Sequence, residues 1–65
     1  MQIRFNGELI HTEHHSLDAF LVSMVDTKQA FAVSVNGDFV AKQNYQHTTL
    51  HEGSQIDVLS PMQGG

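Results

Sequence analysis

Two Asn-Gly dipeptides, Asn6-Gly7 and Asn36-Gly37, divide this chain into short segments in which apolar and polar residues alternate. Asn-Gly is the pair most favoured in two-residue type I′ turns, because both central residues of such a turn need a positive φ angle. A turn this tight joins antiparallel strands. The sequence therefore predicts two β-hairpins, one over residues 2–10 and one over residues 30–41.

Each predicted hairpin has one apolar face. A two-residue loop places Phe5 opposite Glu8 and Ile3 opposite Ile10, and strand side chains alternate between faces with period two. The same alternation puts three residues of the second hairpin on one face: Phe31, Val33 and Val35. The two tips, FNGELI and VNGDFV, are near copies, but a repeat architecture needs three or more units. We interpret them as two turns that meet the same steric requirement.

Ser16 is the predicted start of a helix. Its hydroxyl is a good acceptor for a free amide of the first turn, and Asp18 places a negative charge near the positive end of the helix dipole. Five apolar residues follow with the spacing i, i+3, i+4, i+7 and i+8: Leu17, Phe20, Leu21, Met24 and Val25. This spacing forms one stripe of an amphipathic helix, which we expect to pack against the sheet.

The last third of the chain predicts an irregular segment, a turn and a strand. Residues 43–49 are polar and without a period, and Leu50 is expected beneath the sheet. Residues 52–54, Glu-Gly-Ser, indicate a tight turn before a strand over residues 55–60 with Ile56 and Val58 facing inward. Pro61 has no amide hydrogen, so this strand should end there or lie at an edge.

Together the elements predict an α+β fold of two layers, with one helix against a sheet of about four strands. The 65 residues form a single domain, and so small a core leaves no room for a deep, enclosed active site. The expected core residues are Ile3, Phe5, Ile10, Leu17, Phe20, Leu21, Met24, Val25, Val33, Val35, Val40, Leu50, Ile56 and Val58.

Charge and composition argue against several classes of function. The formal net charge is −4, which opposes binding to a phosphate backbone, so we expect no nucleic-acid partner. The absence of Cys excludes disulfides, thiolate nucleophiles and cysteine zinc sites. There is no signal-peptide pattern after Met1 and no apolar run of about 18 residues, so we expect a cytoplasmic protein without a membrane span.

Three histidines lie close together in the sequence, His11, His14 and His15. Imidazoles are common metal ligands, but no Asp, Glu or further His at a companion spacing completes a tetrahedral set. We expect no metal site, and the sequence assigns these histidines no role. The carboxylates are scattered over turns and exposed strand positions, where a chain this small cannot desolvate a pair for acid–base catalysis.

The order of elements, together with the terminal Gly64-Gly65, resembles that of the ubiquitin-like β-grasp sulfur carriers. Within this group the chain is most similar to the sulfur carriers of thiamin (thiazole) biosynthesis, the ThiS family. The resemblance covers the whole chain and rests on the opening MQIRFNGE, the hairpin VSVNGDFV and the closing LHEGSQIDVLSPMQGG. It implies a β-grasp fold with one helix on a mixed sheet of about four to five strands.

The resemblance also implies that the chain is a protein co-substrate rather than an enzyme. A ubiquitin-activating-like adenylyltransferase would join the Gly65 carboxylate to AMP, and sulfur from a donor such as a cysteine desulfurase would replace the AMP. Thiazole synthase would then take the sulfur from the resulting C-terminal thiocarboxylate. The isolated chain, a monomer on its own, would bind no cofactor, because the activating enzyme uses the ATP.

Residues 61–65 are expected to form a flexible tail. The residues beyond Pro61 span at most roughly 13–14 Å. Gly64 and Gly65 lack Cβ, which leaves room for the backbone to approach a nucleotide through a narrow channel. Pro61, Met62 and Gln63 would contact a partner. A frayed end without function is the alternative interpretation of this segment.

Phe39 and Leu59 are expected on the outer face of the sheet, because they alternate with residues that face the core. Exposed apolar residues near one another can mark a docking surface. We expect this face, with the tail, to contact the activating enzyme and thiazole synthase.

Three other functions remain open. The chain would also suit the small subunit of a molybdopterin synthase, which shares fold, tail and chemistry but usually has a longer chain. A ubiquitin-like modifier would instead become attached through Gly65 to lysine side chains. A plain interaction module would not need Gly64 and Gly65 at all.

Overall fold

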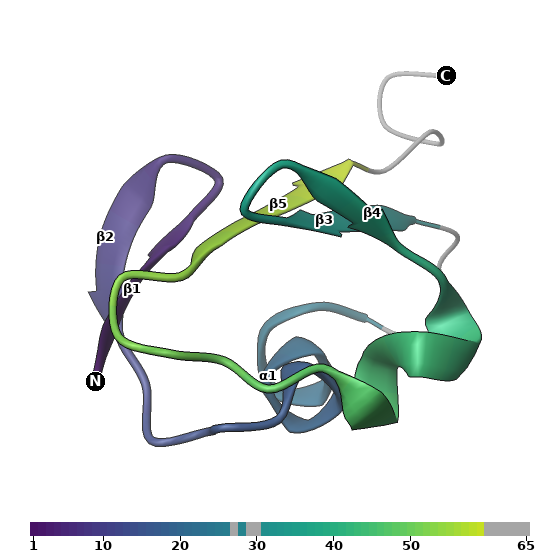
Figure 1. Ribbon diagram of the computed structural model, residues 1–65, viewed down its shortest axis with the longest axis horizontal. Helices are drawn as coiled ribbons and strands as arrows, with labels where there is room; N and C mark the ends of the chain where they lie inside the picture. The colour runs from purple at the N-terminus through teal and green to yellow at the C-terminus, as the bar shows by residue number, and fades with distance from the viewer. Residues whose placement is uncertain (27, 29–30, 60–65) are drawn as a thin grey trace.

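The computed structural model describes residues 1–26, 28 and 31–59, and within them five strands form one mixed sheet in the order β2-β1-β5-β3-β4 (Figure 1). The elements in chain order are β1 (Gln2–Phe5), β2 (Glu8–His11), α1 (Leu17–Met24), β3 (Ala32–Val35), β4 (Asp38–Val40), the 3₁₀ helix η1 (Lys42–His47) and β5 (Gln55–Leu59). Figure 1 shows α1 and η1 on the same side of the sheet. The predicted α+β class and the mixed β-grasp sheet are confirmed.

Both predicted hairpins are present with the expected turns. In the first, Ile3 pairs with Ile10 and Phe5 with Glu8. The φ angles of Asn6 and Gly7 are 52° and 84°, and those of the second turn, at residues 36 and 37, are 53° and 87°. Two positive φ angles in succession are what a type I′ turn requires, so the Asn-Gly pairs account for both registers.

β5 lies at the centre of the sheet, between one parallel and one antiparallel neighbour. It pairs in parallel with β1 through Arg4–Gln55 and Phe5–Ile56, and antiparallel with β3 from Val35–Ile56 to Ala32–Leu59. Of the two alternatives for this strand, an end at Pro61 or a place at an edge of the sheet, the second is therefore wrong. Pro61 and the predicted last strand residue, Ser60, lie outside the described residues, as does Ala30, the predicted first residue of the β3 segment.

Helix α1 begins as predicted but ends earlier. The Ser16 hydroxyl accepts a hydrogen bond from the Ala19 amide, which confirms the N-cap. The helix ends at Met24, because the next residue, Val25, already has extended backbone angles. As a result Met24 lies outside the core, with 44% of its surface exposed. Its predicted place in the core is wrong, since the helix stops before a third turn can pack.

The segment predicted to be irregular is the 3₁₀ helix η1, and it contributes to the core. Tyr45 is buried within η1 and stacks on Phe31 with the ring centroids 6.3 Å apart. The end of η1 is tied to the start of α1, because the Leu17 amide donates to the Thr48 carbonyl at 2.9 Å. One aromatic residue in a polar stretch gave no periodic signal from which this packing could be predicted.

The core lies between the inner face of the sheet and the two helices. Its buried apolar members among the described residues are Ile3, Leu17, Phe20, Leu21, Val33, Tyr45, Leu50 and Ile56. The other predicted core residues except Met24 are partly buried against it: Phe5, Ile10, Val25, Val35, Val40 and Val58. Phe5 and Phe20 meet edge to face, with centroids 5.4 Å apart. The core therefore joins β1 to α1 directly.

Candidate functional site

The residues predicted to carry the chemistry, Gly64 and Gly65, lie outside the described residues, and so do Pro61, Met62 and Gln63. The described residue nearest to them in the chain is Leu59, the last residue of β5. The geometry of the candidate site is therefore that of the strand from which the terminal residues continue, and of the sheet surface around it.

Phe39 and Leu59 lie on one face of the sheet, as predicted. Phe39 pairs with Ser34 across β4 and β3, and Leu59 pairs with Ala32 across β5 and β3. Ala32 and Ser34 are two residues apart in one strand, so all four side chains share a face. Because the intervening Val33 is buried in the core, this is the outer face.

Both apolar side chains are strongly exposed. Phe39 has 72% of its surface accessible and Leu59 has 71%. They stand on strands two positions apart, about 10 Å at the usual strand spacing, with only the small side chains of β3 between them. Asp57 pairs with Ser34 on the same face and supplies a carboxylate beside the apolar pair. We call Phe39, Leu59, Ala32, Ser34 and Asp57 the outer patch.

A third exposed apolar residue, Leu9, lies on the outer face and was not among the predicted site residues. Leu9 is 54% exposed and pairs with Arg4, whose other neighbour is Gln55 of β5. The signal was present, because Leu9 precedes the inward Ile10 and must point the other way. Leu9 stands on β2, at the opposite edge of the sheet from β4, so it lies apart from the outer patch.

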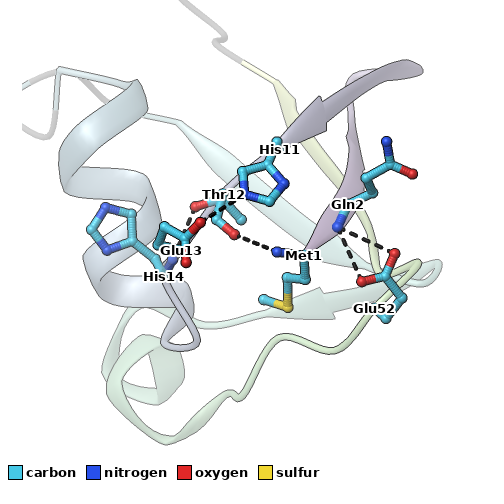
Figure 2. Close-up of polar contacts among 7 residues, drawn as sticks. All are labelled: Met1, Gln2, His11, Thr12, Glu13, His14 and Glu52. Carbon is cyan, nitrogen blue, oxygen red and sulfur yellow. Dashed lines mark hydrogen bonds and ion pairs between the residues drawn. The ribbon is translucent and has the colours of Figure 1, made fainter.

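The histidine-containing segment that begins at the last residue of β2 forms local polar contacts (Figure 2). His11 Nε2 lies 2.7 Å from the Glu13 carboxylate, and both side chains are exposed. The hydrogen bond from His11, its charge and the nearby N-terminal amino group hold the pKa of Glu13 below its ordinary value. The backbone amide of His14 donates to the Thr12 hydroxyl at 3.1 Å. The His11–Glu13 ion pair is exposed, so water and dissolved ions weaken its electrostatic attraction.

These contacts do not assemble a metal centre within the described part of the chain. No group of three His, Cys, Asp or Glu side chains there is arranged to hold a metal ion. In Figure 2 the imidazole ring of His14 points away from the His11–Glu13 pair.

The same view shows how the start of β1 is fastened. The Met1 amino group donates to the Thr12 carbonyl at 2.9 Å, and the Gln2 amide donates to the Glu52 carboxylate at 3.1 and 3.2 Å (Figure 2). The Gly53 amide in turn donates to the Gln2 carbonyl at 2.8 Å. The turn before β5 is thereby attached to β1, which helps to fix the strand that leads to the terminal residues.

Among the described residues, no helix has the length and apolar character needed to cross a membrane.

Comparisons with known proteins agree with this architecture. Residues 2–65 match the ThiS family. A crystal structure of the thiamine biosynthesis protein (ThiS) from Geobacter metallireducens superimposes with a TM-score of 0.81 over 100% of both chains, at 20% sequence identity. No curated protein sequence matches the chain significantly. At this identity the superposition establishes the shared fold, whereas the family match extends through the final Gly-Gly.

Proposed function

Because the chain belongs to the ThiS family, whose members are ubiquitin-like sulfur carriers of thiamin biosynthesis, we propose that it carries sulfur on the carboxyl group of Gly65. The observation that supports this most strongly is the extent of the family match, which runs over residues 2–65 and so includes both terminal glycines. The protein then acts as a co-substrate, and the catalysis is performed by its partners.

The proposed chemistry begins with activation of a poor acyl donor. A Gly65 carboxylate oxygen attacks the α-phosphorus of ATP, and pyrophosphate leaves. A persulfide from a donor such as a cysteine desulfurase attacks the acyl carbon, and AMP leaves. A thiol then attacks the donor-side sulfur of the sulfur–sulfur bond, so that a disulfide forms with the donor and a thiocarboxylate remains on Gly65. Two easier substitutions thus replace one difficult step.

The chain contributes reach and steric access to this chemistry. Gly64 and Gly65 have no Cβ, so their backbone can enter a narrow channel that other residues would obstruct. β5, from which the chain continues to these glycines, lies in the middle of the sheet with hydrogen-bonded neighbours on both sides. The absence of Cys leaves no side-chain thiol to compete for the activated acyl group.

We propose that the outer patch, with Pro61, Met62 and Gln63, docks on the adenylyltransferase and on thiazole synthase. The exposure of Phe39 and Leu59 on the face opposite the core supports this assignment. Their burial in a complex would remove apolar surface from water without disturbing the fold.

If the outer patch is the docking site, Phe39→Ser combined with Leu59→Ser should weaken binding to both enzymes by about tenfold or more, because burying one large apolar side chain contributes about 1.5–3 kcal/mol and about 1.4 kcal/mol is a factor of ten in affinity. Calorimetry with each enzyme measures the effect. Val22→Ser is the matched control, because Val22 is 62% exposed on α1, in the other layer. Equal affinities for the double variant and the wild type would contradict the assignment.

The test of the carrier function is reconstitution with the activating enzyme, ATP, a sulfur donor and thiazole synthase. We expect sulfur incorporation and thiazole formation with the full chain, and neither after removal of Gly64 and Gly65. Circular dichroism checks that the shortened chain is folded. Sulfur passed to molybdopterin synthase instead of thiazole synthase would identify the other carrier class, and unchanged activity of the shortened chain would leave a plain interaction module.

A further inference from the structure

The two hairpin turns share a contact that a turn motif does not itself require. Asn6 Oδ1 accepts a hydrogen bond from the Val58 amide at 2.7 Å, and Asn36 Oδ1 accepts one from the Gln55 amide at 2.9 Å. The backbone amides of the same two asparagines also donate to β5, that of Asn6 to the Ile56 carbonyl and that of Asn36 to the Gln55 carbonyl. Each turn therefore holds the central strand through two hydrogen bonds from one residue.

The side chains extend the sheet beyond the point where the backbones turn away. With φ angles of 52° and 53°, Asn6 and Asn36 lead their strands into the turns and out of line with β5. In each case the amide oxygen accepts the hydrogen bond that the backbone carbonyl of a continuing strand would accept.

The two contacts support different halves of β5. Within the described residues β1 pairs with β5 only through Gln55 and Ile56, so on this side the Asn6 side chain is what holds Val58. Val58 is the second-last residue of the strand. Asn36 instead holds Gln55, the first residue of β5 and the one farthest along the strand from the terminal segment.

We propose that Asn6 is a positioning residue for the carrier terminus. By holding the Val58 amide, it fixes the end of β5 from which the chain continues to Gly65, so that the terminal carboxylate is presented to the activating enzyme from a constant origin. This inference rests on the proposed carrier function. Small errors in the placement of a reacting group lower the reaction rate. The loss of this one side-chain hydrogen bond is therefore expected to lower turnover.

The turn chemistry supplies a discriminating set of variants. Asp-Gly and Gly-Gly also suit type I′ turns, so neither substitution at the asparagine prevents the turn. Asn6→Gly removes the side-chain acceptor, Asn6→Asp keeps an acceptor oxygen, and Asn36→Gly makes the same change in the matched turn at the other end of β5.

The experiment combines amide exchange with activation kinetics at a temperature where all variants are folded. In Asn6→Gly we expect the Val58 amide to exchange roughly three to ten times faster, and kcat/KM for ATP-dependent conversion by the activating enzyme to fall by a similar factor, the effect of losing about one hydrogen bond. Asn6→Asp should restore both quantities. Asn36→Gly should accelerate exchange of the Gln55 amide and lower the melting temperature about as much as Asn6→Gly does. It should leave kcat/KM within roughly twofold of the wild type.

Equal losses of kcat/KM in the two glycine variants, in proportion to their melting temperatures, would show that Asn6 only stabilises the fold and would overturn the inference. Faster exchange of the Val58 amide in Asn6→Gly with unchanged kcat/KM would also overturn the inference. If the wild-type chain itself is not converted, the proposed function fails first. If the wild type and Asn6→Gly are converted equally well, the inference alone fails.

Discussion

Positive backbone φ angles occur, among the described residues, in the turns that determine the path of the chain: Asn6, Gly7, Asn36, Gly37 and Gly53. Gly53 lies in the turn before β5, with φ at +84°, and apart from Gly53 and its two chain neighbours no residue has an atom within 4 Å of the position where a Cβ would stand. A side chain there would therefore meet conformational strain but no steric clash. This turn also donates to the Gln2 carbonyl, so its shape matters to the attachment of β1.

At the residue scale we predict that Gly53→Ala lowers stability by about 1–2 kcal/mol, the usual penalty of the left-handed region for a residue with a Cβ. For a domain of this size each kcal/mol lowers the melting temperature by roughly 4–8 °C. Gly53→Asn is the matched control and should lose clearly less, because Asn enters this region more readily. Thermal unfolding that shows no loss for Ala, or equal losses for Ala and Asn, would contradict the strain argument.

At the scale of single elements, the sequence predicted what depends on neighbouring residues and missed what depends on packing. The hairpin registers follow from two residues at each turn, and the start of α1 follows from Ser16 and the residues just after it. The end of the helix at Met24 and the 3₁₀ helix around Tyr45 have no comparable local signal. Both depend on how the connecting segments reach the sheet.

The early end of α1 predicts unequal costs for two residues of the same apolar stripe. Leu21 is 1% exposed, so Leu21→Ala should cost about 2–5 kcal/mol through lost burial and a cavity. Met24 is 44% exposed, so Met24→Ala should change stability by only about 0.5 kcal/mol. Chemical denaturation of both variants makes the comparison. A large loss at Met24 would mean that the helix continues into the core in solution.

Tyr45 provides a pH-dependent test of η1. Burial raises the pKa of its phenol above the ordinary value of about 10. The folded state therefore favours the neutral phenol. The stability that this preference contributes is complete below pH 10, and it is lost as the pH rises through the raised pKa. Since the chain has one Tyr and no Trp, absorbance titration reports this group alone.

We expect Tyr45 to titrate above pH 10, and Tyr45→Phe to reduce the loss of stability between neutral and strongly alkaline pH. The comparison with Tyr45→Phe separates the contribution of the Tyr45 phenol from other effects of alkaline pH on stability. Titration at or below pH 10, or an equally steep alkaline loss in the Phe variant, would contradict the burial of Tyr45.

At the scale of the whole molecule, the two faces of the sheet have different tasks. The inner face packs on α1 and η1, and the outer face presents Phe39 and Leu59 to solvent. The central strand β5 belongs to both, because Ile56 faces the core while Asp57 and Leu59 face outward. The segment that ends in Gly65 therefore starts from a strand that is supported on both edges.

Much of this arrangement was predictable, but not all of it. Alternation in the strands indicated the inner and outer positions, and the family resemblance implied the mixed sheet. The order of the strands and the two asparagine contacts to β5 were not predictable, because they join residues far apart in sequence. Leu9 was missed although its alternation with Ile10 was visible. The roles of residues 61–65 remain predictions.

The most direct test of the carrier function is to locate sulfur on the chain. The protein is incubated with the activating enzyme, ATP and a sulfur donor, treated with a thiol-reactive label, and its C-terminal fragment is sequenced by mass spectrometry. Fragment ions are needed because exchange of oxygen for sulfur adds nearly the same mass as oxidation of any of the three Met residues. A sulfur carrier should show an ATP-dependent label at Gly65 that disappears when thiazole synthase and its substrates are added. An unmodified Gly65 with an enzyme of proven activity, or a Gly65 joined to lysine, would contradict this function.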